Sequence, residues 1–336
     1  MIGHQMSLWT SRTPLRVSFF GGGTDYPEYF SRYRGAVLGC AIDQHIYISA
    51  LRMERFIGYA YRLSYRIIEE VNEHDEIEHP VFREVFKWLK LDKGWNFGVL
   101  SSLPARSGLG SSSSFTVGLL NLLSHIQGLN YTRHDLARTA INVERDILRE
   151  NVGIQDQIHA AYGSLNRYEF HRDEFSIHPV RLHGPTRDAI NSSLFLVYTG
   201  NQRYASEVVR EQIEKTKDSK IDRELSHLYD LTIAGQQAFE LSDPEAALNE
   251  VGRLLRDAWN TKRGLTKSVS SPTIDEIYDT AMDCGALGGK LCGAGGGGFF
   301  LLLVPNHCRE RLQERLGDRR LVPIRMDEIG STVYRT

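Results

Sequence analysis

A glycine- and serine-rich segment that could bind phosphate runs through residues 104–120, with the sequence PARSGLGSSSSFTVGLL. Gly108 and Gly110 allow the backbone to turn tightly and to approach a ligand closely. The serines that follow open a helix, whose N-terminus presents unpaired N–H groups and a partial positive charge of about half a unit. We interpret the segment as a phosphate cradle. The alternative is a serine-rich helix cap beside loop glycines.

This cradle does not match the common nucleotide-binding signatures. The string nearest to a Walker loop, GALGGKL at residues 285–291, has the wrong spacing and no hydroxyl after its lysine. In the dinucleotide fingerprint, Ser113 occupies the place of the third glycine, and no acid stands where a ribose would need one. The signatures of protein kinases are also absent from the sequence.

A second glycine-rich segment covers residues 13–30, TPLRVSFFGGGTDYPEYF. A strand leads into three successive glycines and then into Thr24 and Asp25. A carboxylate beside such an accessible backbone suits a ligand rich in hydroxyls, and the alternative is a hairpin turn. Arg16 lies within the strand among apolar residues, and a buried arginine requires an anionic partner.

Two more segments could contribute to the same chemistry. The glycine loop KLCGAGGGGFFLLLV at residues 290–304 lies between two buried strands, so it could close over a phosphate, line the first glycine loop, or form only a hairpin. Residues 142–163 carry Glu144 on a helix and Asp156 at the start of the next. Such an acidic pair can supply a metal ligand and a group that orients or deprotonates a hydroxyl, although surface carboxylates are the alternative.

Periodicity predicts the elements that position these segments. In the first half we expect strands at 15–20, 36–42, 44–51 and 98–103, and helices at 81–91, from the serine run to Gly128, from Thr132, and at 155–162. In the second half we expect strands at 193–198, 290–292, 299–304 and 321–325, and helices at 205–217, 221–240, 244–260, 272–285 and 306–316. Segregated strands and helices indicate an α+β protein with two lobes, residues 1–188 and 189–336.

Bulk properties exclude several classes of protein. The net charge of −2 provides no global field for nucleic acid or an anionic membrane. The four cysteines form no C-x-x-C pair or zinc-site spacing, the N-terminus lacks the apolar core of a signal peptide, and the longest apolar run, FFLLLV, is too short to cross a bilayer. We expect a soluble cytoplasmic protein whose partners are small molecules, with a homodimer left open.

In order and spacing, these segments resemble the motifs of the GHMP kinases, the superfamily of galactokinase, homoserine kinase, mevalonate kinase and phosphomevalonate kinase. The middle motif of that family, P-x-x-x-G-L-G-S-S-[AS]-[AS], is matched by residues 104–114, and its C-terminal motif, K-x-x-G-A-G-G-G-G, by residues 290–298. The resemblance covers nearly the whole chain. It implies an ATP-dependent kinase with an N-terminal ribosomal-S5-like lobe and a C-terminal ferredoxin-like lobe.

The resemblance also assigns roles. It implies that Ser112 and Glu144 hold Mg²⁺, that Asp156 is the catalytic aspartate, and that Arg16 keeps Asp156 ionised and aligned with the acceptor hydroxyl. The residues implied to bind the nucleotide are Arg106, Ser107, Gly108, Leu109, Gly110, Ser111, Ser112 and Ser113. Those implied to bind the acceptor are Gly22, Gly23, Thr24, Asp25, Arg203, Gly293, Ala294, Gly295 and Gly296.

The first motif separates branches within the superfamily. Galactokinase reads G-E-H-T-D where this chain reads GGGTD, a string that resembles the branch of D-glycero-D-manno-heptose 7-phosphate kinases, with fucokinase-like enzymes close by. The segment YTGNQRYASEVV at residues 198–209 also resembles the heptose branch. A phosphorylated acceptor needs a cation away from the ATP loop, and Arg203, or Lys262 with Arg263, could supply it. Each could equally be a solvated surface charge.

The resulting interpretation is an anomeric kinase that converts heptose 7-phosphate and ATP into heptose 1,7-bisphosphate and ADP, for nucleotide-activated heptose in a surface polysaccharide. A fucokinase-like enzyme acting on an unphosphorylated sugar is the alternative. A non-catalytic sugar and ATP sensor on the same fold is a third possibility, which the presence of both Glu144 and Asp156 disfavours.

Overall fold

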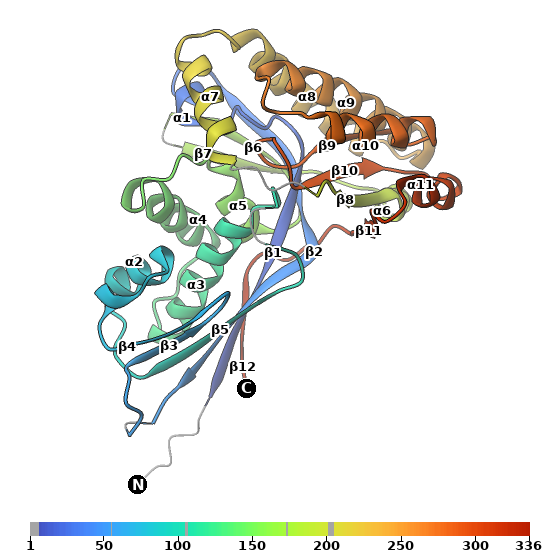
Figure 1. Cartoon of the computed structure of the whole chain (residues 1–336). Helices are drawn as coiled ribbons and strands as arrows, with labels where there is room; N and C mark the ends of the chain where they lie inside the picture. The colour runs from blue at the N-terminus through green and yellow to red at the C-terminus, as the bar shows by residue number, and fades with distance from the viewer. Residues whose placement is uncertain (1–6, 55, 105–106, 173, 201–204) are drawn as a thin grey trace.

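A computed structural model describes residues 7–54, 56–104, 107–172, 174–200 and 205–336. The predictions made for Arg106 and Arg203 lie outside these described residues. The strands form two sheets, each with helices packed on it, and the two parts meet near the upper end of β1 (Figure 1). The expected α+β class with two lobes is therefore confirmed.

The first sheet has the strand order β12-β1-β2-β5-β3-β4, and β6 and β7 extend it from β2. All of these pairings are antiparallel except that of β3 with β5. Its strands are β1 (Leu8–Phe20), β2 (Gly35–Arg52), β3 (Tyr61–Ser64), β4 (Ile68–Val71), β5 (Trp95–Ser101), β6 (Leu165–His171), β7 (Glu174–Pro179) and β12 (Thr332–Arg335).

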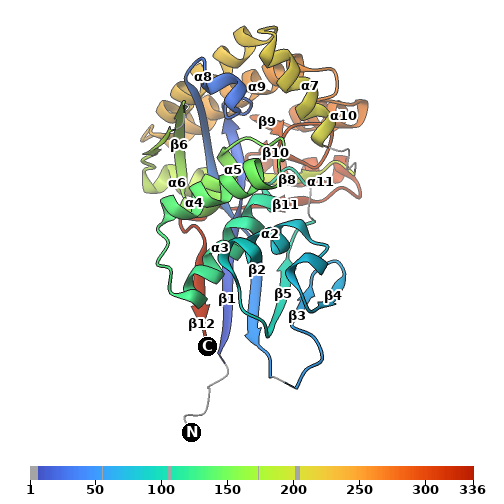
Figure 2. The same cartoon turned by 90° about the vertical axis from the view of Figure 1, so that its left-hand side faces the viewer.

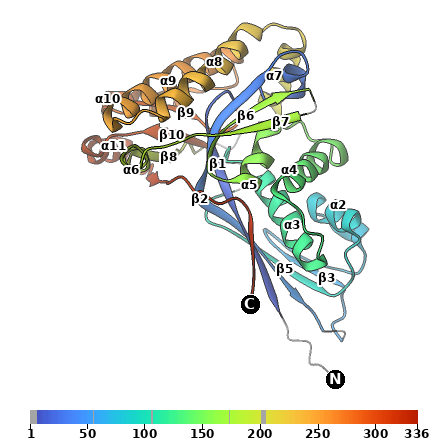
Figure 3. The same ribbon diagram turned by 180° about the vertical axis from the view of Figure 1, so that it is seen from behind.

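The second sheet has the strand order β11-β8-β10-β9, all antiparallel. Its strands are β8 (Leu194–Tyr198), β9 (Gly288–Leu291), β10 (Phe299–Leu303) and β11 (Leu321–Pro323). Helices α9 and α10 pack on β9 of this sheet, and α8 lies along α9 and reaches β1 and β2 of the first sheet (Figures 1 and 3). The helices of this half are α6 (Gly184–Ser193), α7 (Ala205–Lys217), α8 (Asp222–Phe239), α9 (Pro244–Leu265), α10 (Pro272–Asp283) and α11 (Arg309–Leu316), with a 3₁₀ turn at Asn306–Cys308.

In the first half, α3 and α5 pack against β1 and β2, and α2 and α4 pack on α3. Figure 2 views these helices in front of the sheet. The helices of this half are α1 (Pro27–Phe30), α2 (Pro80–Leu89), α3 (Ser111–Gln127), α4 (Arg133–Asn142) and α5 (Gln155–Tyr162), with a 3₁₀ turn at His74–Glu76 and a π-helical turn, η2, at Val143–Ile147. Helix α3 is buried continuously from Ser113 to Ser124, between β1, β2, α4 and α5. A helix that is buried all round occupies a core, so the segment predicted to bind phosphate lies at the N-terminus of a core helix.

Two helix boundaries follow the expected sequence signals. Thr132 and Asp135 form the predicted capping box, in which each side chain bonds the other's backbone N–H. Helix α3 ends at Gly128, which adopts the left-handed conformation (φ 67°) that a glycine tolerates best.

Strand β1 carries Arg16 between two irregularities in its pairing with β2. The register shifts between Pro14 and Leu15 and again between Ser18 and Phe20. Such β-bulges bend a strand and re-aim its side chains. The strand is therefore redirected on both sides of Arg16, where it passes under α3 and α5.

The end of the chain returns to the first sheet. β12 pairs with β1, and the backbone N–H groups of Ser164 and Asp327 donate to the carbonyls of Asp327 and Ala41 on the way. The last residues thus pack on the first half of the chain, whereas the sequence assigned them to the second lobe. The boundary near residue 188 falls within α6 and stays a prediction.

Several short elements escaped the sequence analysis. These include helix α1, the hairpins β3–β4 and β6–β7, helix α6 and strand β12. Strand β4, with the sequence IEEV, shows no apolar alternation, and the alternation in β7 is limited to Phe175 and Ile177. The sequence predicted two strands, at 36–42 and 44–51, but β2 is one continuous strand of 18 residues.

A glycine contact in the second lobe generates a stability prediction. A Cβ added at Gly252 of α9 would lie 2.5 Å from Leu287 Cβ and 2.7 Å from the Leu287 carbonyl oxygen. Gly252→Ala should therefore lower the free energy of unfolding by about 1–3 kcal/mol through overpacking, despite the better helix propensity of alanine. The matched control is Gly264→Ala in the same helix, where no atom lies within 4 Å. That change should raise the free energy of unfolding by up to about 1 kcal/mol. Equal changes in the two variants, measured by urea titration, would contradict the prediction.

Candidate active site

A buried ion pair between Arg16 of β1 and Asp156 of α5 lies at the centre of the site. The Arg16 Nε and Nη2 atoms each donate to a carboxylate oxygen of Asp156 at 2.7 Å. The Arg16 side chain is only 6% exposed, whereas Asp156 keeps 26% exposure and can reach a ligand. Burial by itself would lower the pKa of Arg16, but the Asp156 carboxylate raises it, so the guanidinium stays charged. The two residues predicted to act in catalysis are thus brought together.

Arg16 also holds the phosphate cradle in place. Its Nη1 donates to the Gly108 carbonyl at 2.6 Å, and its backbone N–H donates to the Leu109 carbonyl at 3.0 Å. Gly110 caps α3 with φ 74°, and Arg16 side-chain atoms lie 3.1–3.5 Å from where its Cβ would be. A side chain at Gly110 would therefore press on the guanidinium.

Asp25 is buried beside this pair on the turn after β1. Its carboxylate accepts hydrogen bonds from the Gly23 N–H (3.0 Å) and from Gln155 Nε2 (2.8 Å), and its carbonyl accepts from the Ile154 N–H. Burial raises the pKa of Asp25 and repulsion from Asp156 raises it further, while these hydrogen bonds oppose the shift. The predicted acceptor-binding aspartate thus lies close enough to Asp156 for the two charges to interact.

Thr24 has a structural part in the same turn. Its hydroxyl lies 2.8 Å from the carbonyl oxygens of Gly21 and Ala36, and it accepts from the Ala36 N–H at 2.9 Å. These protein contacts fix the turn onto β2. The predicted role of Thr24 in acceptor binding stays a prediction.

Glu144 lies on the π-helical turn η2, which extends α4, and its side chain is fully buried. Such turns occur often at functional sites. Ser113 Oγ and Gln157 Nε2 both donate to Glu144 Oε2, at 2.8 and 2.5 Å. Burial raises the pKa of Glu144 to about 7. Within the described parts of the chain, the other oxygen, Oε1, is buried and has no hydrogen-bond partner.

These groups are compatible with a magnesium ion shared with phosphates. Mg²⁺ prefers oxygen ligands and is usually bound by one or two carboxylates together with substrate phosphates. Glu144 Oε1 offers one such oxygen. Ser113 rather than Ser112 contacts Glu144, and Ser112 is exposed at the start of α3. Among the described residues, no group of three or more His, Cys, Asp or Glu side chains could enclose a metal.

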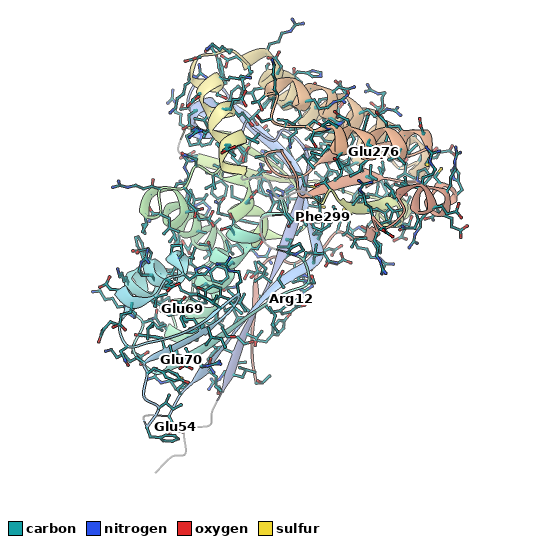
Figure 4. All side chains as sticks on the ribbon, in the orientation of Figure 1. Arg12, Glu54, Glu69, Glu70, Glu276 and Phe299 are labelled. Atoms are coloured by element: carbon teal, nitrogen blue, oxygen red, sulfur yellow. The ribbon has the colours of Figure 1, made fainter. Side chains whose placement is uncertain are left out.

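The third glycine-rich loop packs on the phosphate cradle. A Cβ at Gly108 would lie 2.7 Å from the Cys292 carbonyl oxygen, and one at Gly293 would lie 2.7 Å from Gly108 Cα. The Phe299 N–H donates to the Ser107 carbonyl at 3.0 Å, where the two lobes meet (Figure 4). The sequence left three roles open for this loop. These contacts support the role in which it lines the glycine loop that contains Gly108. Its predicted contacts with the acceptor stay a prediction.

Two buried lysines hold this loop from the second lobe. Lys262 Nζ donates to the carbonyls of Leu291 (3.0 Å) and Gly293 (2.5 Å), and Lys290 Nζ donates to the Ser18 carbonyl of β1 (2.8 Å). Burial lowers the pKa of Lys262 to about 7 and that of Lys290 to about 8. Lys262 is therefore not a solvated surface charge. Arg263 pairs with Asp275 and lies over two aromatic rings of its own lobe.

Sequence reasoning missed several residues of the site. Gln155 and Gln157 flank Asp156 and each holds another acid. Gly153 packs against Asp25, because a Cβ there would lie 1.9 Å from Asp25 Oδ2. The polar residues next to Asp156 and the glycine before it were the available signals. Their partners, however, lie far away in the sequence.

Gly153 allows a test of the acceptor side. Gly153→Ala should displace the tethered Asp25 carboxylate and raise the KM for the acceptor about tenfold or more, because the new methyl group overlaps Asp25 Oδ2. The KM for ATP should change by less than about twofold. Gly98→Ala in β5, where no atom lies within 4 Å, is the control. Steady-state kinetics with an unchanged acceptor KM would remove Asp25 from the acceptor site.

Comparisons with known proteins match this chain to the GHMP kinases. Residues 66–164 match the family described as GHMP kinases N terminal domain, and residues 244–320 match GHMP kinases C terminal. The chain is 28% identical over 306 residues to D-glycero-alpha-D-manno-heptose 7-phosphate kinase of Campylobacter jejuni, with 88% of each chain covered. It is 24% identical over 332 residues to the bifunctional fucokinase/GDP-fucose pyrophosphorylase of Arabidopsis thaliana, of which it spans 31%.

The fold agrees with these matches. The crystal structure of a D-glycero-D-manno-heptose 1-phosphate kinase from Bacteroides thetaiotaomicron superposes with a TM-score of 0.72 at 22% identity, covering 97% of this chain and 98% of that one. No helix in the described residues is long and apolar enough to cross a membrane. From its two matched domains, its fold and its glycine motifs, the chain belongs to the GHMP kinases, a family of ATP-dependent phosphotransferases.

Proposed function

We propose that this protein is a sugar kinase that transfers the γ-phosphate of ATP to the anomeric hydroxyl of D-glycero-D-manno-heptose 7-phosphate, giving the 1,7-bisphosphate and ADP. The observation that carries the proposal is the bidentate Arg16–Asp156 pair, which is hydrogen-bonded to the phosphate cradle and lies beside the buried Asp25. The GGGTD turn and the 28% identity to a heptose 7-phosphate kinase support the choice of sugar. Nucleotide-activated heptose for a surface polysaccharide is the use we infer, with the enzyme in the cytoplasm.

In this proposal Asp156 orients the acceptor hydroxyl and receives its proton. The carboxylate is partly exposed, and Arg16 fixes both of its oxygens, so it presents a defined lone-pair direction to the hydroxyl. Phosphoryl transfer is mostly positioning and charge stabilisation. Arg16 contributes to both, since it aligns Asp156 and shapes the cradle through Gly108.

The cradle would hold the ATP phosphates at the N-terminus of α3. The backbone from Ser107 to Ser113 turns through two glycines with positive φ, Gly108 and Gly110, and its first-turn N–H groups can donate to phosphate oxygens. Glu144 and a serine of the cradle would hold Mg²⁺, which when bound neutralises charge on the transferred phosphoryl group. Glu144 is suited to this because Oε1 has no partner among the described residues.

Fucokinase-like activity on an unphosphorylated sugar is the alternative, supported by the 24% identity to a fucokinase-containing protein. The two differ in whether the acceptor carries a phosphate. The non-catalytic sensor has less support, because both acids are present and each is held by specific hydrogen bonds.

The role of Asp156 can be tested by a single substitution. Asp156→Asn should lower kcat by about 10²–10⁴-fold, because the amide cannot accept the proton, while ATP binding measured by calorimetry persists. Asp146→Asn, an exposed acid on η2, is the control and should keep wild-type kcat. Near-normal turnover of the Asp156→Asn enzyme would refute the assignment.

The acceptor is best identified by an ADP-release screen over sugars and sugar phosphates, with the position of the new phosphate read by NMR. We expect heptose 7-phosphate to give the highest kcat/KM and a product phosphorylated at the anomeric carbon. Higher activity with unphosphorylated fucose would favour the alternative.

Arg203 provides the matching test for the acceptor phosphate. Arg203→Ala should raise the KM for heptose 7-phosphate about tenfold or more, because a charge-assisted contact is lost, and leave the KM for ATP nearly unchanged. An unchanged acceptor KM would exclude Arg203 from the site.

A further inference from the structure

Three consecutive side chains in the first turn of α5 each bond a charged group from a different element. Gln155 Nε2 donates to Asp25 Oδ2 (2.8 Å) on the turn after β1, and Asp156 pairs with Arg16 of β1. Gln157 Nε2 donates to Glu144 Oε2 (2.5 Å) on η2. Because a helix has 3.6 residues per turn, neighbouring side chains point about 100° apart. The single turn therefore reaches two acids and one arginine of the site in three directions.

Each glutamine bonds one oxygen of its acid and leaves other polar atoms open. Gln155 Oε1, Gln157 Oε1 and Glu144 Oε1 are all buried, and none has a hydrogen-bond partner in the portion of the chain that is described. Buried polar atoms are nearly always paired in folded proteins. Two of these unpaired atoms lie on the first turn of α5 and the third lies on η2. They indicate where ligand atoms complete the network.

We propose that Gln155 and Gln157 are positioning residues with separate tasks. Gln155 fixes the Asp25 carboxylate for the sugar acceptor, and Gln157 fixes the Glu144 carboxylate for the divalent cation. The inference rests on the proposed function for what Asp25 and Glu144 bind, but not on which sugar is the acceptor.

The choice of amide side chains has a physical reason. Ser113 Oγ and Gln157 Nε2 both donate to Glu144 Oε2, which favours one orientation of the carboxylate and leaves Oε1 for the cation. A lysine or arginine in place of Gln157 would neutralise Glu144 and weaken its attraction for a cation. A neutral amide orients the carboxylate and keeps its charge available. The same holds for Gln155 and Asp25.

The test compares Gln155→Met with Gln157→Met in the full-length enzyme. Methionine is close in length to glutamine but cannot donate, and the two sites are on one helix turn and both buried, so each variant is the control for the other. Gln157→Met should weaken Mn²⁺ binding to the AMP-PNP complex, measured by electron paramagnetic resonance, by about 10–100-fold. Its acceptor KM should change by less than about twofold. Gln155→Met should show the reverse, with an acceptor KM raised about tenfold and Mn²⁺ affinity near wild type.

Three outcomes would overturn the inference. Equal losses of Mn²⁺ affinity and acceptor affinity in both variants would mean that the glutamines only stabilise the turn. Unchanged Mn²⁺ affinity in Gln157→Met would show that Gln157 does not position Glu144 for the cation. An unchanged acceptor KM in Gln155→Met would show that Gln155 does not position Asp25 for the acceptor. Should either methionine variant fail to fold, Gln155→Asn and Gln157→Asn, which shorten the amide by one methylene, give the same comparison.

The same experiments distinguish this inference from the proposed function. The Mn²⁺ measurement needs no acceptor, and the acceptor measurement uses any sugar that the wild-type enzyme phosphorylates. A wild-type enzyme that does not phosphorylate heptose 7-phosphate would therefore contradict the proposed substrate. The roles of the two glutamines would still be tested by their own variants.

Discussion

The structure of the site depends on one buried ion pair, Arg16–Asp156. Arg16 is 6% exposed and would carry an unpaired charge into the core without its carboxylate partner, which is a cost of several kcal/mol. The same guanidinium bonds the Gly108 carbonyl, and the Arg16 backbone bonds Leu109. One residue of β1 therefore fixes the acid at the start of α5 and the loop that opens α3. These two elements cannot move apart without exposing the arginine.

Close backbone contacts connect the loop that opens α3 to the second lobe. Gly108 and Gly293 lie so near each other that neither tolerates a Cβ, and Gly298 meets Ser107 in the same way. Lys262 and Lys290 donate to carbonyls on either side of this contact. Buried ammonium groups are costly unless they are hydrogen-bonded, so the lysines hold the third loop against the cradle. The two glycine motifs thus function as one packed unit, although about 180 residues separate them in the chain.

Each acid of the site has its own side-chain partner. Asp25, Asp156 and Glu144 are bound by Gln155, Arg16 and Gln157 respectively, and only Asp156 has a charged partner. Burial raises the pKa of Asp25 and that of Glu144, and the Gln155 and Gln157 amides that bond them carry no charge. Under the proposed function, Asp156 would act on the acceptor hydroxyl, Asp25 would bind the sugar and Glu144 would bind the cation.

The sequence alone determined the α+β class, the three glycine loops, both ends of α3, the start of α4, and the need of Arg16 for an anionic partner. These follow from local backbone requirements of glycine, from periodicity, and from the rule that a buried arginine needs an anion. That this partner is Asp156 was implied by the resemblance to the GHMP kinases. Only the tertiary structure decided that Ser113 rather than Ser112 bonds Glu144, that the Thr24 hydroxyl is used within its own turn, and that β12 returns to the first sheet. The reason is that neighbouring serines look alike in sequence. Which hydroxyl meets an acid 31 residues away is set by the rotation of α3 against η2, and packing alone fixes that rotation.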